Sequence, residues 1–241
     1  MIQPLSPAEH TTAGLDQAWS QLARAGGWFD GHERIAIAAE ARAARGCGFC
    51  AERKAALSPY SVAGRHDESE TILSDLAVDT IHRITTDPGR LSERWYGEVA
   101  DAGMCPEELV EITSIIGVIT IADTLARALS QPERALPAAI EGEPHRQPVS
   151  GTTLTRGWVP MVEPESAEGM LKLMYDELVA GVGFVFNVAR ALTSVPEAVR
   201  DFFAAFIPNY GTHGPVRPGG LDRTQVEFLA SSTSAWNDCF Y

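Results

Sequence analysis

Apolar residues recur three or four positions apart along most of the chain, which is the spacing of one face of an α-helix. Leu15, Trp19 and Leu22 follow this spacing, and a pair of glycines then interrupts the run. The segment that begins at Asp30 has the residue types of a helix start and leads into a second helical run toward Cys47. No stretch alternates apolar and polar residues between hairpin turns. The pattern therefore predicts an all-α fold.

The most regular apolar stripe lies in the middle of the chain. Residues 106–129 carry Leu109, Ile112, Ile116 and Ile119 at helical spacing, with a proline at the first position. Shorter helices are predicted around 71–84 and 91–102, and later in the chain over 170–178, 187–192, 196–206 and 222–235.

A proline-rich stretch separates the two sets of predicted helices. Six prolines between positions 131 and 165 break any long regular element, which is typical of a connection between modules. We therefore predict two tandem helical modules, the second incomplete. The predicted boundaries are an N-terminal module at 1–130, a connection at 131–165 and a C-terminal module at 166–241.

The charge balance argues against polyanionic partners. The 241 residues include 19 basic and 32 acidic side chains, for a net charge of −13, without a run of Lys or Arg. Nucleic acids and anionic membranes attract basic faces, so we expect neither as a partner. The longest uncharged stretch, 202–216, is shorter than the ~20 residues of a membrane helix. Residues 1–12 lack the basic and apolar regions of a secretory signal, so we expect a cytoplasmic protein.

Cys47 and Cys50 form the first feature with chemical potential, a C-x-x-C pair. Two thiols at this spacing can close a small disulfide, and a helix start would lower the pKa of the first thiol. Two buried small side chains, or half of a zinc site, are the alternatives. The remaining cysteines are isolated and no histidine pair has ligand spacing, which argues against zinc. His66 and His82 are expected at solvated surface positions.

Glu227 and Cys239 form the second feature, with eleven residues between them. This segment resembles the active-site motif of the alkylhydroperoxidase D and carboxymuconolactone decarboxylase superfamily. That motif runs Glu, eleven residues, Cys, two residues, Cys, three residues, His. The second Cys would stand at position 242, one position beyond Tyr241. Selenocysteine at that position, a truncated sequence and a degenerate site are three explanations, of which we favour selenocysteine.

The resemblance implies reduction of hydroperoxides by a thiol or selenol in a homo-oligomer, with an external thiol as reductant and no cofactor or metal. Cys239 would belong to the redox pair, Glu227 would relay its proton, and Cys47 and Cys50 would be a second dithiol. The first module departs from the motif. Ile35 stands twelve residues before Cys47 where the motif has Glu, and Lys54 stands four residues after Cys50 where it has His.

The separation of Glu227 and Cys239 sets a geometric condition on this chemistry. A straight helix would hold them about 18 Å apart, so the chain must break between them. Asn237 or Asp238 would then cap a new helix that begins at Cys239. Two other functions remain open: a non-enzymatic helical assembly or binding protein on the same scaffold, and a decarboxylase of the carboxymuconolactone type.

Overall fold

The structure is a computed structural model that describes residues 9–67, 70–154, 157–210, 220–237 and 239. Helices dominate these residues, and their only sheet is a two-stranded antiparallel one, so the predicted all-α fold is confirmed. The elements are α1 (Glu9–Leu22), α2 (Gly31–Ala44), α3 (Gly48–Ala55), α4 (Asp75–Thr86), α5 (Glu93–Asp101), α6 (Pro106–Ala128), β1 (Thr152–Thr153), β2 (Met161–Val162), α7 (Gly169–Val182), α8 (Asn187–Arg190), α9 (Pro196–Tyr210) and α10 (Arg223–Trp236), with 3-10 helices at Pro59–Ser61, Pro88–Arg90 and Pro164–Ser166.

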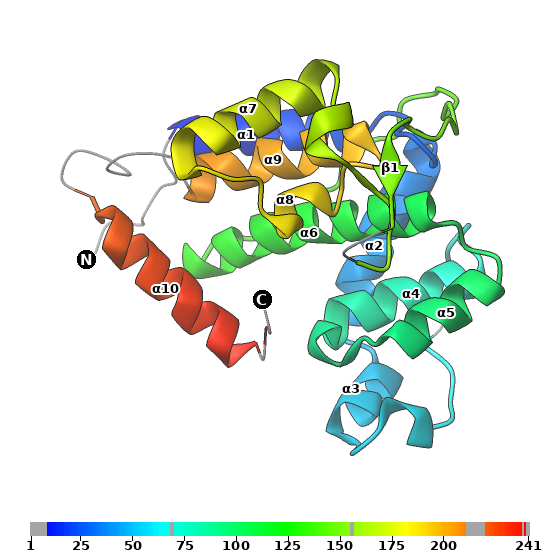
Figure 1. Ribbon diagram of the computed structural model, residues 1–241. Helices are drawn as coiled ribbons and strands as arrows, with labels where there is room; N and C mark the ends of the chain where they lie inside the picture. The colour runs from blue at the N-terminus through cyan, green and yellow to red at the C-terminus, as the bar shows by residue number, and fades with distance from the viewer. Residues whose placement is uncertain (1–8, 68–69, 155–156, 211–219, 238, 240–241) are drawn as a thin grey trace, which may run out of the picture.

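Helix α6 runs through the centre of the molecule (Figure 1), with α1, α7 and α9 on one side and α4 and α5 on the other. Its start follows the sequence signals: Pro106 is the first residue, and Glu108 accepts a hydrogen bond of 2.8 Å from the backbone N–H of Cys105. Ile112 and Ile119 of its apolar stripe are fully buried. Among the described residues α6 alone is long and apolar enough to cross a membrane, but 61% of its most apolar window is buried, as in the core helix of a soluble protein.

A buried ion network joins helices from both halves of the chain. Arg34 of α2 pairs with Glu111 of α6 and with Asp201 of α9, and all three side chains are at most 5% exposed. The backbone N–H of Trp28 donates a further hydrogen bond of 2.7 Å to Glu111. A Cβ atom at Gly26 would collide with both Glu111 and Arg34, so the network needs glycine there. Helices α2, α6 and α9 therefore share one charged centre. The division of the chain into two modules stays a prediction.

Two elements extend from the layers around α6. Helix α3 lies at the outer end of the α4 and α5 side, and α10 lies apart from the other helices (Figure 1). Within α3 only Cys50 is buried, and none of the described side chains of α10 is. Both helices are therefore held by few apolar contacts, and in α3 the buried residue belongs to the C-x-x-C pair.

Candidate thiol and imidazole site

Cys47 and Cys50 occupy the start of α3. Cys47 is the N-cap residue and Cys50 is the third helical residue, so both lie in the first turn. Helix α2 ends at Ala44, and a short turn carries the chain directly into α3. Each cysteine is 3% exposed, and both thiols are free. The C-x-x-C pair therefore has the placement at a helix start that favours an ionised thiol.

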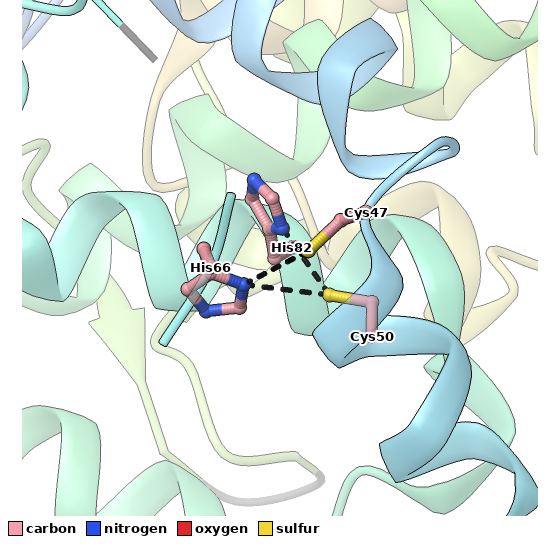
Figure 2. A group of neighbouring side chains, drawn as sticks. All are labelled: Cys47, Cys50, His66 and His82. Carbon is pink, nitrogen blue, oxygen red and sulfur yellow. Dashed lines mark hydrogen bonds between the residues drawn. The ribbon is translucent and has the colours of Figure 1, made fainter. Parts of the chain in front are cut away.

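Two histidines from other segments face this pair (Figure 2). His66, from the segment after the 3-10 helix Pro59–Ser61, places Nδ1 3.7 Å from the sulfur of Cys47 and 3.5 Å from that of Cys50. His82, from α4, places Nδ1 3.2 Å from the Cys50 sulfur. These four ligand-type atoms all lie within 4.8 Å of one another.

A carboxylate holds the far nitrogen of each histidine. Glu40 of α2 lies 2.7 Å from Nε2 of His82, and both side chains are at most 3% exposed. Asp79 of α4 lies 2.9 Å from Nε2 of His66 and also pairs with Arg53 at 2.5 Å. With Nε2 of His82 donating its proton to Glu40, Nδ1 of that ring presents a lone pair toward the Cys50 sulfur.

The surroundings of Cys47 and His66 favour opposite charges. Burial raises the pKa of the Cys47 thiol, but hydrogen bonds from the backbone of Asp67 and Cys50 and from His66 outweigh it, so the pKa is lowered. Burial lowers the pKa of His66, but the hydrogen bond to Asp79 and the neighbouring sulfurs raise it to about 10. A thiolate and an imidazolium therefore stabilise each other here.

The surroundings of His82, the second imidazole, favour its neutral form. Burial lowers the pKa of His82 and the nearby His66 lowers it further, although Glu40 opposes both. The Asp79 carboxyl stays ionised: burial raises its pKa, but His66 and Arg53 hold it at about 2. The surroundings thus favour the neutral form of His82 and the cationic form of His66.

A cleft of about 960 Å³ lies beside the site, and Phe49, His66 and Asp79 are among its lining residues. Neither buried cysteine lines it, so the thiols lie behind His66. A Cβ atom at Gly64 would lie 2.6 Å from the Phe49 ring, so only glycine lets this segment lie so close to α3.

The C-x-x-C spacing identifies the two cysteines, but no sequence motif identifies their histidine and carboxylate partners. The prediction of a surface position is wrong for His82, which is 1% exposed, and the side chain of His66 is only 12% exposed. One signal was present in the sequence: Glu40 shares a helix face with Ile37 and Ala44, and a charge on an apolar stripe needs a buried partner.

The C-terminal candidates are not brought together by any described contact. Glu227 accepts a hydrogen bond of 2.7 Å from the hydroxyl of Tyr210 and pairs with Arg223. Cys239 is exposed and lies beyond the end of α10, which continues unbroken past Glu227 to Trp236. Asn237 ends α10, whereas Asp238 lies outside the described residues. A redox role for Glu227 and Cys239 stays a prediction.

No family model matches this sequence, and comparison with curated proteins and with solved structures gives no match either. The resemblance to the alkylhydroperoxidase D superfamily therefore rests on the residues quoted above.

Cys105 should be the least reactive of the described thiols. Burial raises its pKa, and the charges of Glu108 and Glu107 add to this, giving a value of about 11. At pH 8 only about one in a thousand of these thiols is ionised, and the thiolate is the reactive form. We expect Cys105 to react with iodoacetamide about 100-fold more slowly than an unstructured cysteine peptide, as measured by timed alkylation and peptide mass spectrometry. A rate equal to that of the peptide would contradict this assignment.

Proposed function

We propose that the protein is a thiol-dependent peroxidase whose reacting dithiol is Cys47 and Cys50. The observation that carries the proposal is the hydrogen-bonded chain from Glu40 through His82 to the sulfur of Cys50. A thiol next to an imidazole that a carboxylate orients is the arrangement of an activated nucleophile. The second thiol lies within 4.8 Å, which suits it to resolve an oxidised Cys50.

In the proposed reaction His82 takes the proton of Cys50, and the thiolate attacks the terminal oxygen of a hydroperoxide. The O–O bond breaks, Cys50 becomes a sulfenic acid, and the leaving alkoxide takes the proton from His82. The thiolate of Cys47 then attacks the Cys50 sulfur, which forms the disulfide and releases water once a proton is supplied. Two thiols are oxidised and one hydroperoxide is reduced to an alcohol.

Return to the dithiol requires two electrons from an external thiol, which a reducing compartment such as the cytoplasm supplies. The resemblance of the Glu227–Cys239 segment to a peroxidase motif agrees with this reaction class. In this proposal Cys47 and Cys50 are the main redox pair, and Cys239 would belong to a further one. A homo-oligomer remains the expected assembly.

The test is stoichiometric oxidation of the reduced, chelator-treated protein by hydrogen peroxide. One equivalent should remove two thiols, and peptide mapping without reductant should find a disulfide between Cys47 and Cys50. Cys50→Ser should abolish the disulfide, whereas the matched change Cys105→Ser, at a thiol outside the site, should leave it intact. If both thiols persist in the wild-type protein, the non-enzymatic alternative replaces this proposal.

A further inference from the structure

Cys47, Cys50, His66 and His82 together have the composition of a tetrahedral zinc site. Two thiolates and two imidazoles are a common ligand set of structural Zn²⁺ in proteins. In such a site the metal binds deprotonated sulfur and the lone pair of a neutral imidazole nitrogen. The four side chains come from the start of α3, the segment before α4, and α4 itself, so one ion would cross-link all three.

The distances between the ligand atoms fit such a tetrahedron. Zinc bonds of about 2.3 Å to sulfur and about 2.0 Å to nitrogen place sulfur and nitrogen ligands about 3.5 Å apart in a tetrahedron. Three of the four sulfur–nitrogen separations of the cluster are 3.7, 3.5 and 3.2 Å, and all four ligand atoms lie within 4.8 Å of one another. These atoms therefore already lie near their positions around a metal.

The partners of the two imidazoles fit a metal as well. Histidine ligands of metals usually donate their second N–H to a carboxylate, which fixes the ring and makes the other nitrogen a better ligand. Glu40 does this for His82 and Asp79 does it for His66, at 2.7 and 2.9 Å. Hydrogen bonds between thiols and imidazoles alone do not require a carboxylate on the second nitrogen of both rings.

We propose that the reduced protein binds one Zn²⁺ through Cys47, Cys50, His66 and His82, and that oxidation by a hydroperoxide releases it. With all four positions filled by protein, the ion would protect the thiolates and would not act as a Lewis acid. Release follows because a disulfide no longer offers thiolates. The zinc-bound thiolates, one hydroperoxide and two protons give a disulfide, an alcohol, water and free Zn²⁺. The release step rests on the peroxidase proposed above, whereas the binding step does not.

Binding is tested on the full chain, reduced and stripped of metal, by competition with a chromogenic zinc chelator. We expect one Zn²⁺ per chain, and with Co²⁺ the visible absorption of a tetrahedral site together with a thiolate charge-transfer band. His66→Ala should weaken binding at least tenfold, and Asp79→Asn, which keeps the shape of a partly exposed side chain, about tenfold. His32→Ala, at an exposed histidine outside the cluster, is the control. Equal affinity in all four proteins, or a Co²⁺ spectrum without the thiolate band, would overturn the site.

Release is tested by adding one equivalent of peroxide to the zinc-loaded protein while free zinc and free thiols are counted together. We expect one Zn²⁺ to appear for every two thiols lost. Zinc that stays bound after both thiols are oxidised would refute the release step. The same peroxide titration of the zinc-free protein separates the two proposals. If its thiols survive, both the peroxidase and the release step are refuted. The chelator competition then still decides whether the metal site exists.

Discussion

Arg34→Met should lower the free energy of unfolding by about 3–5 kcal/mol, because it leaves buried carboxylates without their cation. Glu111 and Asp201 are 0% and 5% exposed, and Arg34 pairs with both. Urea unfolding followed by circular dichroism measures the loss. Arg94→Met is the matched control, since Arg94 is 71% exposed and contacts only the exposed Glu98 carboxylate and the Tyr60 ring among the described residues. It should change the stability by less than about 1 kcal/mol.

The stability loss in Arg34→Met should also depend on pH. Burial already raises the pKa of Glu111 in the native protein, and Arg34 opposes this shift. Without the arginine the folded-state pKa of Glu111 rises further above its unfolded value. The variant then loses stability as pH rises through that interval, so its deficit should be larger at pH 8 than at pH 5. Equal losses in Arg34→Met and Arg94→Met, or a deficit that grows toward acid pH, would contradict the importance of this network.

His82→Asn should slow the reaction of the dithiol with peroxide by about 10²- to 10⁴-fold, the usual contribution of a general base. His82 lies 3.2 Å from the Cys50 sulfur, and burial lowers its pKa, which favours the neutral base. Asparagine keeps a polar side chain but cannot take up the proton. The rate is measured on zinc-free protein by stopped-flow mixing with peroxide and quenching of the remaining thiols. The variant therefore tests whether the reaction rate depends on proton transfer to His82, and not only on the closeness of the two sulfurs.

The matched control for His82→Asn is His145→Asn, at a partly exposed histidine that contacts Glu197. It should react at the wild-type rate. Glu40→Gln keeps a hydrogen-bond acceptor for His82 but removes the charge, so we expect a smaller loss of about tenfold. If His82→Asn reacts as fast as the wild type, the imidazole is not the base, and the chain from Glu40 does not support catalysis.

The helices could be predicted from the sequence because their signals are local. The start of α2 illustrates this: Asp30 accepts a hydrogen bond from the backbone of Glu33, and Glu33 accepts one from Asp30, as the spacing predicts. The apolar stripe and N-terminal proline of α6 are equally local. The short pair of strands β1 and β2 was missed, since its two-residue strands lie in a segment dominated by proline.

The site could be predicted only in part, because its residues meet through packing of the helices. The C-x-x-C spacing identified Cys47 and Cys50, which lie in one helical turn. His66 and His82 lie 16 and 32 positions beyond Cys50, and no short spacing rule connects them. Their approach depends on the packing of α4 against α2 and α3, which the sequence does not encode in any single segment. The same packing supplies Glu40.

The sparse apolar packing of α3 has a consequence for how this part of the chain is ordered. Its only buried residue is Cys50, and Leu57, just beyond its end, is fully exposed. The site is therefore the local core of this segment. A disulfide would tie Cys47 only to a residue three positions away, whereas a shared metal ion would tie both to His66 and His82. Amide hydrogens of residues 57–67 should thus exchange faster in the oxidised protein than in the zinc-bound one. The redox state of two sulfurs would then set how often this eleven-residue segment unfolds locally.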